Sequence, residues 1–175
     1  MNNVSKNNQK EINNKTLPPE LIEALIADSI LIAKDVVVEL YQGFEEVMMF
    51  AGGLLYNVAK KAGKLMAKKL IEKGYLNKQN YLDILVESLV RSNYATKVEI
   101  KEIEGTPENP KKIVFELHGT LLGARIGKRK EPVDQPIAGF IAGWIEEVTG
   151  RKTNAKETQC IAQGHKTCKI EVELK

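Results

Sequence analysis

The spacing of apolar residues changes once along this chain, and that change limits the folds open to it. In residues 52–74, apolar side chains recur every three or four positions, which is the period of an amphipathic helix. In residues 96–105 and 111–120 they alternate with polar side chains, as in strands with one buried face. Helical spacing followed by strand spacing predicts an α+β fold, in which N-terminal helices pack on a C-terminal antiparallel sheet.

The same two periods predict the remaining elements. Further helices are expected over residues 17–51, 78–92 and 136–150, and further strands over 121–127, 155–163 and 166–175. The apolar positions of the first of these helices are so dense that we expect it to be buried on more than one side, against a second subunit if the protein dimerises. Glycine inside a helix is costly, so Gly63 indicates either close approach of another element or a loosely packed helix. The small residues at Gly139 and Gly143 would let a sheet or another helix come close.

Length and composition favour one globular domain preceded by a short arm. Residues 1–16 are rich in Asn and Lys and are expected to form a flexible arm, and residues 17–175 a single domain. The 26 basic and 23 acidic residues balance too closely to predict direct nucleic-acid binding. We find no apolar run long enough to span a bilayer and no signal peptide, which leads us to expect a cytoplasmic, reducing location.

Two cysteines near the C-terminus are the main functional candidates. A hairpin around Gly164 would set Cys160 opposite Cys168, with their Cβ atoms about 4.5–5.5 Å apart. That separation suits two zinc ligands, a cross-strand disulfide or a pair of buried free thiols, and the spacing alone does not choose among them. Glu157 would face away from Cys160 in a regular strand, so it can join a metal site only if the strand is bulged or begins later.

Two other side chains could complete such a site. Asp134 lies in the loop before the helix at 136–150, and His165 lies in the hairpin turn. A carboxylate or an imidazole can bind zinc beside two thiolates. For Asp134, capping the following helix is an alternative role.

Several segments resemble the V4R (4-vinyl reductase-like) domain family. The matching pieces are "PVD", "AGFIAGW", "ETQC" and "AQGHKTC", and "GGLLYNVAKKAGKLMAKKL" is similar to the N-terminal helix pair of that family. The resemblance covers about residues 40–174. It implies the α+β fold shared with Bet3-type trafficking subunits, a homodimer, and in phenol-sensing transcription activators an apolar ligand pocket beside a structural zinc.

The resemblance also implies a set of metal ligands. By the positions that match the family motif, Glu157, Cys160 and Cys168 would bind zinc, and Asp134 stands where the family has a cysteine. Aspartate is a competent zinc ligand through oxygen. Four protein ligands leave no position for a reactive water, so the zinc would be structural.

The sequence predicts ligand contacts and a function, but no catalytic residue. No Ser-His-Asp triad, P-loop or dinucleotide-binding turn is present. The candidate contacts for an apolar or aromatic ligand are Phe115, Leu117, His118, Phe140 and Trp144, although the helical spacing of Trp144 also fits a core residue. We therefore expect a sensory or regulatory small-molecule-binding domain. The alternatives are an accessory protein or enzyme in tetrapyrrole (vinyl) reduction and a scaffold subunit with a lipid-filled or empty cavity.

Overall fold

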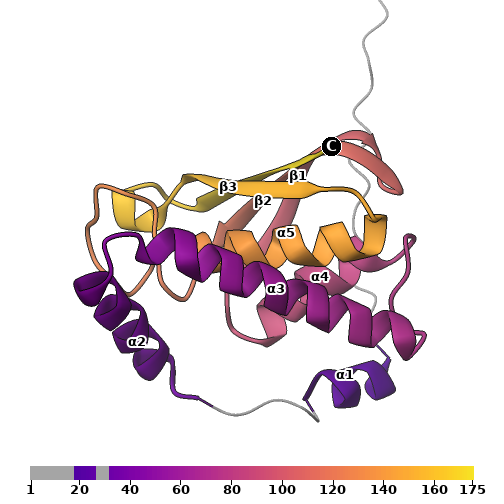
Figure 1. Ribbon diagram of the computed structural model, residues 1–175, viewed down its shortest axis with the longest axis horizontal. Helices are drawn as coiled ribbons and strands as arrows, with labels where there is room; N and C mark the ends of the chain where they lie inside the picture. Colours follow the sequence, from indigo (N-terminus) through magenta and orange to yellow (C-terminus); the bar gives the residue numbers. More distant parts are fainter. Residues whose placement is uncertain (1–17, 27–31) are drawn as a thin grey trace, which may run out of the picture.

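The computed structural model describes residues 18–26 and 32–175, in which helices precede and then interrupt one sheet (Figure 1). The expected arm, residues 1–16, lies outside the described residues. The helices are α1 (Pro19–Ile26), α2 (Lys34–Val47), α3 (Ala51–Glu72), α4 (Tyr81–Arg91) and α5 (Gln135–Thr149). The strands are β1 (Lys97–Thr106), β2 (Asn109–His118), β3 (Thr153–Gln159) and β4 (Cys168–Leu174), with a short 3-10 helix, η1 (Ile161–Gln163), between the last two.

The four strands form an antiparallel sheet in the order β1-β2-β4-β3. Figure 1 shows the sheet as one layer, with α5 and α3 beneath it and α4 beside them. The predicted α+β fold is confirmed. No helix in the described part of the chain is both long and apolar enough to cross a membrane.

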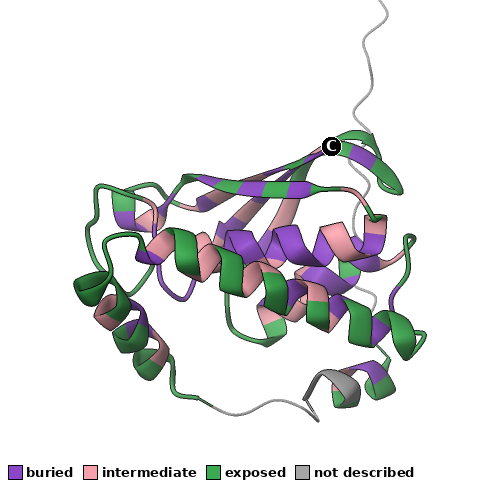
Figure 2. Ribbon diagram, viewed as in Figure 1, coloured by how far each residue is buried: buried purple, intermediate pink, exposed green. Residues whose placement is uncertain are grey.

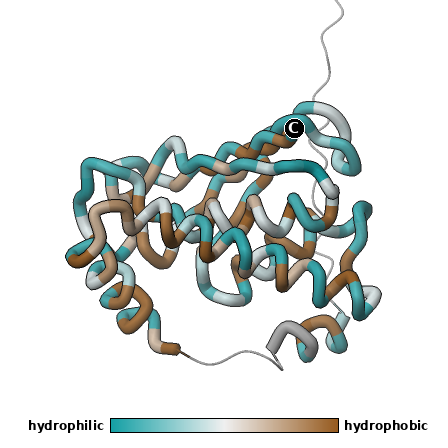
Figure 3. The backbone as a smooth tube through the Cα atoms, in the orientation of Figure 1, coloured by the Kyte–Doolittle hydropathy of each residue, from teal (hydrophilic) through white to brown (hydrophobic). Residues whose placement is uncertain are grey.

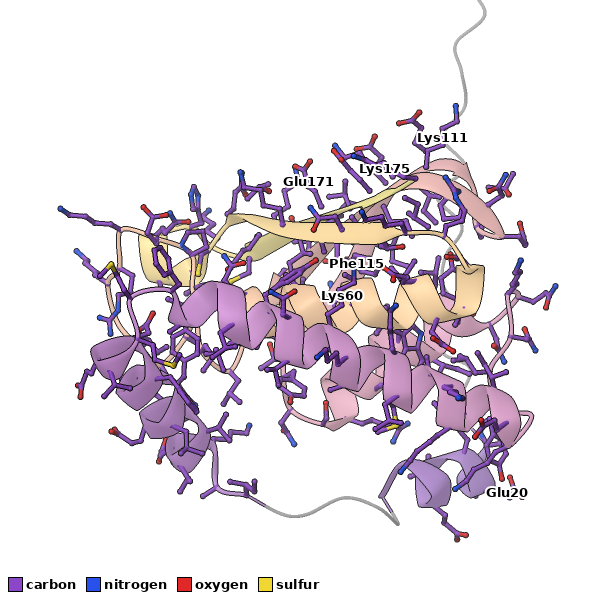
Figure 4. The ribbon with its side chains drawn as sticks, viewed as in Figure 1. Glu20, Lys60, Lys111, Phe115, Glu171 and Lys175 are labelled. Carbon is purple, nitrogen blue, oxygen red and sulfur yellow. The ribbon has the colours of Figure 1, made fainter. Side chains whose placement is uncertain are left out.

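The two faces of the sheet differ in the way that strand alternation predicts. Phe115 and its neighbours on one face are fully buried, whereas Glu171 on the other face is partly exposed. Figure 4 shows Phe115 between the sheet and the helices and Glu171 on the opposite side. The core therefore lies between the sheet and the α3–α5 layer, and α5 consists largely of buried residues (Figure 2).

Helices α3 and α5 lie unusually close because glycines line their contact. A Cβ atom at Gly139 would overlap the carbonyl oxygen of Tyr56, and one at Gly143 would overlap that of Lys60. On the α3 side of the contact, a Cβ atom at Gly63 would overlap the carbonyl oxygen of Phe140. The close approach that the glycines predict is thus confirmed, and the approaching element is the other helix.

Charged groups join the same two helices to β3. Glu146 of α5 accepts from Lys60 Nζ at 2.7 Å, forms a second ion pair with Lys64, and accepts from the backbone N–H of Thr153 at 3.0 Å. Lys60 Nζ also donates to the carbonyl oxygen of Thr153 at 2.5 Å. Burial alone would raise the pKa of Glu146, but the hydrogen bonds from Lys60 and Lys64 outweigh it and hold the pKa at about 2.

Two predicted elements differ from the structure. The segment expected as one buried helix over residues 17–51 contains two separate helices, α1 and α2, and α2 exposes much of its apolar surface. The strand expected over 121–127 is wrong, because this segment forms successive turns, with the N–H of Ala124 bonded to Thr120 and that of Ile126 to Leu122. The turns of the backbone direct its apolar side chains into the core, which the alternation of a strand would not do for neighbouring residues.

The glycine contact predicts a large effect of one methyl group. We expect Gly143→Ala to lower the free energy of unfolding by about 2 kcal/mol or more, because backbone atoms of α3 cannot move aside cheaply. Gly53→Ala is the matched control on α3, since nothing lies within 4 Å of its Cβ position. Urea unfolding of both variants tests this, and equal stability of the two would contradict the close packing.

The carboxylate of Glu146 predicts a pH-dependent contribution to stability. Its folded-state pKa of about 2 lies below its ordinary value of 4.5, so its stabilising effect is fully present above about pH 4.5 and is lost as the pH falls toward 2. Glu146→Gln should lower the unfolding free energy by about 1–2 kcal/mol at pH 7, allowing for partial exposure. Chemical unfolding from pH 7 to pH 2.5 should show this difference shrinking, whereas Glu147→Gln serves as control. A constant difference would be evidence against the ion pairs.

Candidate metal centre

Four acidic side chains from three segments meet in the interior. They are Asp134 just before α5, Glu157 in β3, Cys160 just after β3 and Cys168 at the start of β4. Each is at most 1% exposed. One donor atom from each residue lies within 4.8 Å of the others. The structure therefore brings together the four residues that the motif resemblance selects.

A β-bulge lets Glu157 join this group. The pairing of β3 with β4 shifts between Glu157, opposite Ile170, and Gln159, opposite Lys169. The shift adds one residue to β3, and both Glu157 and Cys160 then face the interior. This meets the condition under which the sequence allowed Glu157 to take part.

The two cysteines face each other as free thiols. Their sulfur atoms are 3.9 Å apart, and no disulfide joins them. Two sulfurs bound to one tetrahedral zinc at about 2.3 Å would be separated by about 3.8 Å. The observed spacing therefore needs almost no adjustment to hold zinc, whereas a disulfide would need the sulfurs to approach to about 2.05 Å.

Asp134 occupies the N-cap position of α5, yet its side chain makes no capping hydrogen bond. Its Oδ2 instead accepts from Thr120 Oγ1 at 2.5 Å and from Cys168 Sγ at 3.1 Å. Its backbone N–H donates to Glu157 Oε2 at 2.8 Å. The helix start thus orients Asp134 toward the other donors, and the capping role considered from the sequence is not the one observed.

Two further residues shape the centre and were missed in the sequence. Thr120 is fully buried and its hydroxyl lies 3.4 Å from Cys168 Sγ. A Cβ atom at Gly123 would lie 2.5 Å from that hydroxyl and 2.9 Å from Asp134 Oδ2. The only available signal was a glycine within the apolar run at 121–127, which strand alternation obscured. His165 is exposed in the hairpin turn and is not part of the cluster.

Each carboxylate keeps one buried oxygen without a partner. Asp134 Oδ1 and Glu157 Oε1 are inaccessible and accept no hydrogen bond from the residues that the structure describes. An unsatisfied buried polar atom costs about 1–3 kcal/mol, and more if it is charged. Two such atoms beside two thiols are what a site for a cation provides.

Burial makes the two carboxyl groups of the centre hard to ionise without a cation. It raises the pKa of Asp134 to about 6, and with the nearby charge of Asp134 it raises the pKa of Glu157 to about 9. The hydrogen bond between the thiols lowers the pKa of Cys160 and raises that of Cys168, so the pair loses one proton readily and keeps the other. A divalent cation binding here would replace the retained protons.

The expected ligand-contact residues do not surround one space. Phe115, Leu117 and Trp144 are fully buried in the common core, and the Phe140 ring packs on Trp144 with centroids 6.0 Å apart. Trp144 Nε1 donates to the carbonyl oxygen of Tyr81 at 3.1 Å. His118 lies on the opposite, outer face of the sheet.

A surface cavity of about 390 Å³ lies next to the candidate centre. It is bounded by the end of α2, the start of α3 and the loop that carries Asp134. The buried ring of Tyr41 forms part of its wall, and Gln135 lies on the other side. Burial and a hydrogen bond with Glu45 raise the pKa of Tyr41, to which the charges of Asp134 and Glu157 also contribute. The charges of the centre thus reach one wall of this cavity.

Three uncharacterised proteins of Methanocaldococcus jannaschii resemble this chain. One is 24% identical over 89% of this chain and 91% of its own length. A second is 34% identical over 47% of this chain and 50% of its own length, and a third is 26% identical over 69% and 64%. This chain therefore spans about half to two thirds of the latter two relatives.

Three solved structures share the fold. The phenol-responsive sensory domain of the transcription activator PoxR, solved with phenol, has a TM-score of 0.72 at 15% identity, covering 83% of this chain and 76% of that one. A vinyl-4-reductase family protein of M. jannaschii has a TM-score of 0.57 at 24% identity, with coverage of 90% and 94%. A trafficking protein particle complex subunit 3 of Naegleria fowleri, covalently bound to palmitic acid, has a TM-score of 0.60 at 14% identity, with coverage of 81% and 95%.

The family match covers the part of the chain that contains the candidate metal centre. The V4R domain family matches residues 113–174, which include all four buried donors. The resemblance to the V4R family that the sequence motifs indicate is thus confirmed over residues 113–174.

Proposed function

We propose that this protein is a small-molecule-binding domain of sensory or regulatory type, whose fold is stabilised by a structural zinc ion. The observation that carries the proposal is the pair of unpartnered buried oxygens, Asp134 Oδ1 and Glu157 Oε1, beside two free thiols. A core that kept these groups without a cation would be destabilised by each of them.

The donor set suits zinc better than calcium or magnesium. Two sulfur and two oxygen donors match the tetrahedral coordination of zinc, whereas calcium and magnesium take oxygen ligands. When bound, the ion would link the loop at Asp134, the bulge at Glu157 and the hairpin that joins Cys160 to Cys168. Zinc-bound thiolates fit a reducing compartment, which supports a cytoplasmic location.

The ligand part of the proposal draws on the fold. The PoxR sensory domain is phenol-responsive and shares the fold of this chain. Phe115, Leu117, Phe140 and Trp144 are packed in or against the core beneath the sheet, so an apolar or aromatic ligand that contacts them would have to displace part of this packing. His118 would be available only to a group on the outer face.

The names of two other structural relatives define the competing functions. A vinyl-4-reductase family protein and a palmitate-bound trafficking subunit share the fold. An accessory role in tetrapyrrole reduction would require a bound macrocycle, and a scaffold role would require an empty or acyl-filled core. These functions differ in what the purified protein should contain.

Native mass spectrometry of freshly purified protein tests the proposal. We expect the protomer mass plus one zinc ion and a small organic molecule, and Cys160→Ser should lose the zinc and unfold at a lower temperature because one thiolate is missing. Lys166→Ser, in the exposed hairpin turn, is the control and should keep the metal. A metal-free wild type, or a Cys160→Ser variant as stable as wild type, would refute the zinc centre. A Soret-type absorption band or a bound acyl chain would favour the two alternatives.

We also propose a homodimer formed through α2 and the segment that joins it to α3. A stripe of apolar side chains at helical spacing, Val36, Leu40, Phe44 and Val47, is 41–79% exposed along α2 and borders a groove of about 540 Å³. Figures 2 and 3 show that α2 contains both exposed and strongly apolar residues. The stripe continues through Met49 and Phe50, which are 90% and 80% exposed. Exposed apolar surface of this extent is typical of an interaction site, and a second copy would cover it.

Light scattering coupled to gel filtration tests the dimer. Wild-type protein should elute with twice the protomer mass of 19.5 kDa, and Leu40→Glu should elute as a monomer because a charge would be buried in the interface. Glu46→Lys, on another side of α2, is the matched control and should remain dimeric. A monomeric wild type at micromolar concentration, or a dimeric Leu40→Glu variant, would contradict this interface.

A further inference from the structure

A second group of metal-binding side chains lies on the outer face of the sheet. Glu99 of β1 and Glu116 and His118 of β2 place three donor atoms within 4.8 Å of one another. His118 Nε2 lies 3.0 Å from Glu99 Oε2 and 3.4 Å from Glu116 Oε1. All three side chains are about one third exposed, so the group is open to ions from solution.

Strand register holds these three residues together. Glu99 pairs directly with Glu116, and His118 follows two positions later on the same face of β2. Like charges directly opposite each other on neighbouring strands repel, so the position calls for a cation. Lys101, at the bulge in β1, supplies one, with its Nζ 3.3 Å from Glu99 Oε2 and 3.2 Å from Glu116 Oε1.

The same two carboxylate oxygens thus contact both the ammonium group and His118. The ammonium group of a lysine can interact with an imidazole nitrogen only by donating a hydrogen bond to it. A metal ion, in contrast, binds imidazole and carboxylate groups together. We propose that Glu99, Glu116 and His118 form a surface site for Zn²⁺ or a similar divalent first-row metal ion, with Lys101 as a built-in competitor. Donors about 2.1 Å from a common ion lie about 3.0–3.4 Å apart, and His118 Nε2 lies 3.0 Å and 3.4 Å from the two carboxylate oxygens.

The competition favours the metal for a physical reason. Lys101 and Lys97, which lies 3.1 Å from Glu99, are 44% and 61% exposed, and exposed ion pairs contribute little to stability. Both side chains are long enough to turn into solvent when an ion arrives. Three protein donors would leave further coordination positions for water or for a group from a partner molecule.

This site does not depend on the proposed function. The buried centre faces the core and contains no histidine, whereas this group lies on the outer face and contains no cysteine. The two sites can therefore be observed separately, since the chain has only two histidines, His118 and His165.

Proton NMR of the two imidazole rings during addition of Zn²⁺ to the purified full chain tests the site. We expect the ring signals of His118 to shift with saturation at micromolar to millimolar zinc, while those of His165, exposed in the hairpin turn, stay in place. The buried centre lacks an imidazole, so whether it contains zinc does not decide whether the His118 signals shift. No saturable shift of His118, or an equal shift of both rings, would overturn the proposal.

Three variants examined by calorimetric zinc titration sharpen the test. Glu99→Gln should weaken this zinc binding about tenfold and His118→Ala should abolish it, since each removes a donor. Lys101→Gln should strengthen it several-fold because the competing ammonium group is gone. The metal content of the buried centre should be the same in all three. Unchanged affinity in Glu99→Gln, or weaker binding in Lys101→Gln, would show that the group is only an ion-pair network.

Discussion

The structure depends on the burial of four acidic donors in one place. Each of Asp134, Glu157, Cys160 and Cys168 is excluded from solvent, and two carboxylate oxygens have no partner among the described residues. Moving such groups out of water costs several kcal/mol per charge unless a counter-charge is supplied. A divalent cation would supply it and would link the segments that carry the donors. The proposed zinc would therefore offset the cost of burying these groups and would cross-link the segments that carry them.

The rest of the fold holds these segments in position. The start of α5 orients Asp134, and α5 is fixed against α3 through contacts at Gly139 and Gly143 that allow no side chain. The Lys60–Glu146 ion pair attaches the same helix pair to β3, which carries Glu157. A rigid helix pair beneath a sheet thus presents one wall of the centre. The V4R match over residues 113–174 covers the segments that supply the donors.

The sequence predicts the parts of this arrangement that depend on local pattern. Alternation places Cys168 on the buried face of its strand, and the glycines of α5 predict a close neighbour. The sequence does not predict what depends on irregular backbone. The bulge that lets Glu157 and Cys160 face the same side has no pattern of its own, and the turns that bring Thr120 and Gly123 to the centre have the apolar residues of a strand. The residues alone left Asp134, Glu157 and His165 as alternatives beside the two cysteines, and the motif resemblance selected the donor set.

Zinc K-edge X-ray absorption of the purified protein tests the central claim most directly, because it counts the atoms around the ion. The proposed centre predicts a first shell of two sulfur atoms at about 2.3 Å and two oxygen atoms at about 2.0–2.2 Å. A first shell without sulfur, or a protein that retains no zinc, would contradict it. Either result would mean that the buried carboxyls and thiols keep their protons and that the core is stabilised without a metal ion.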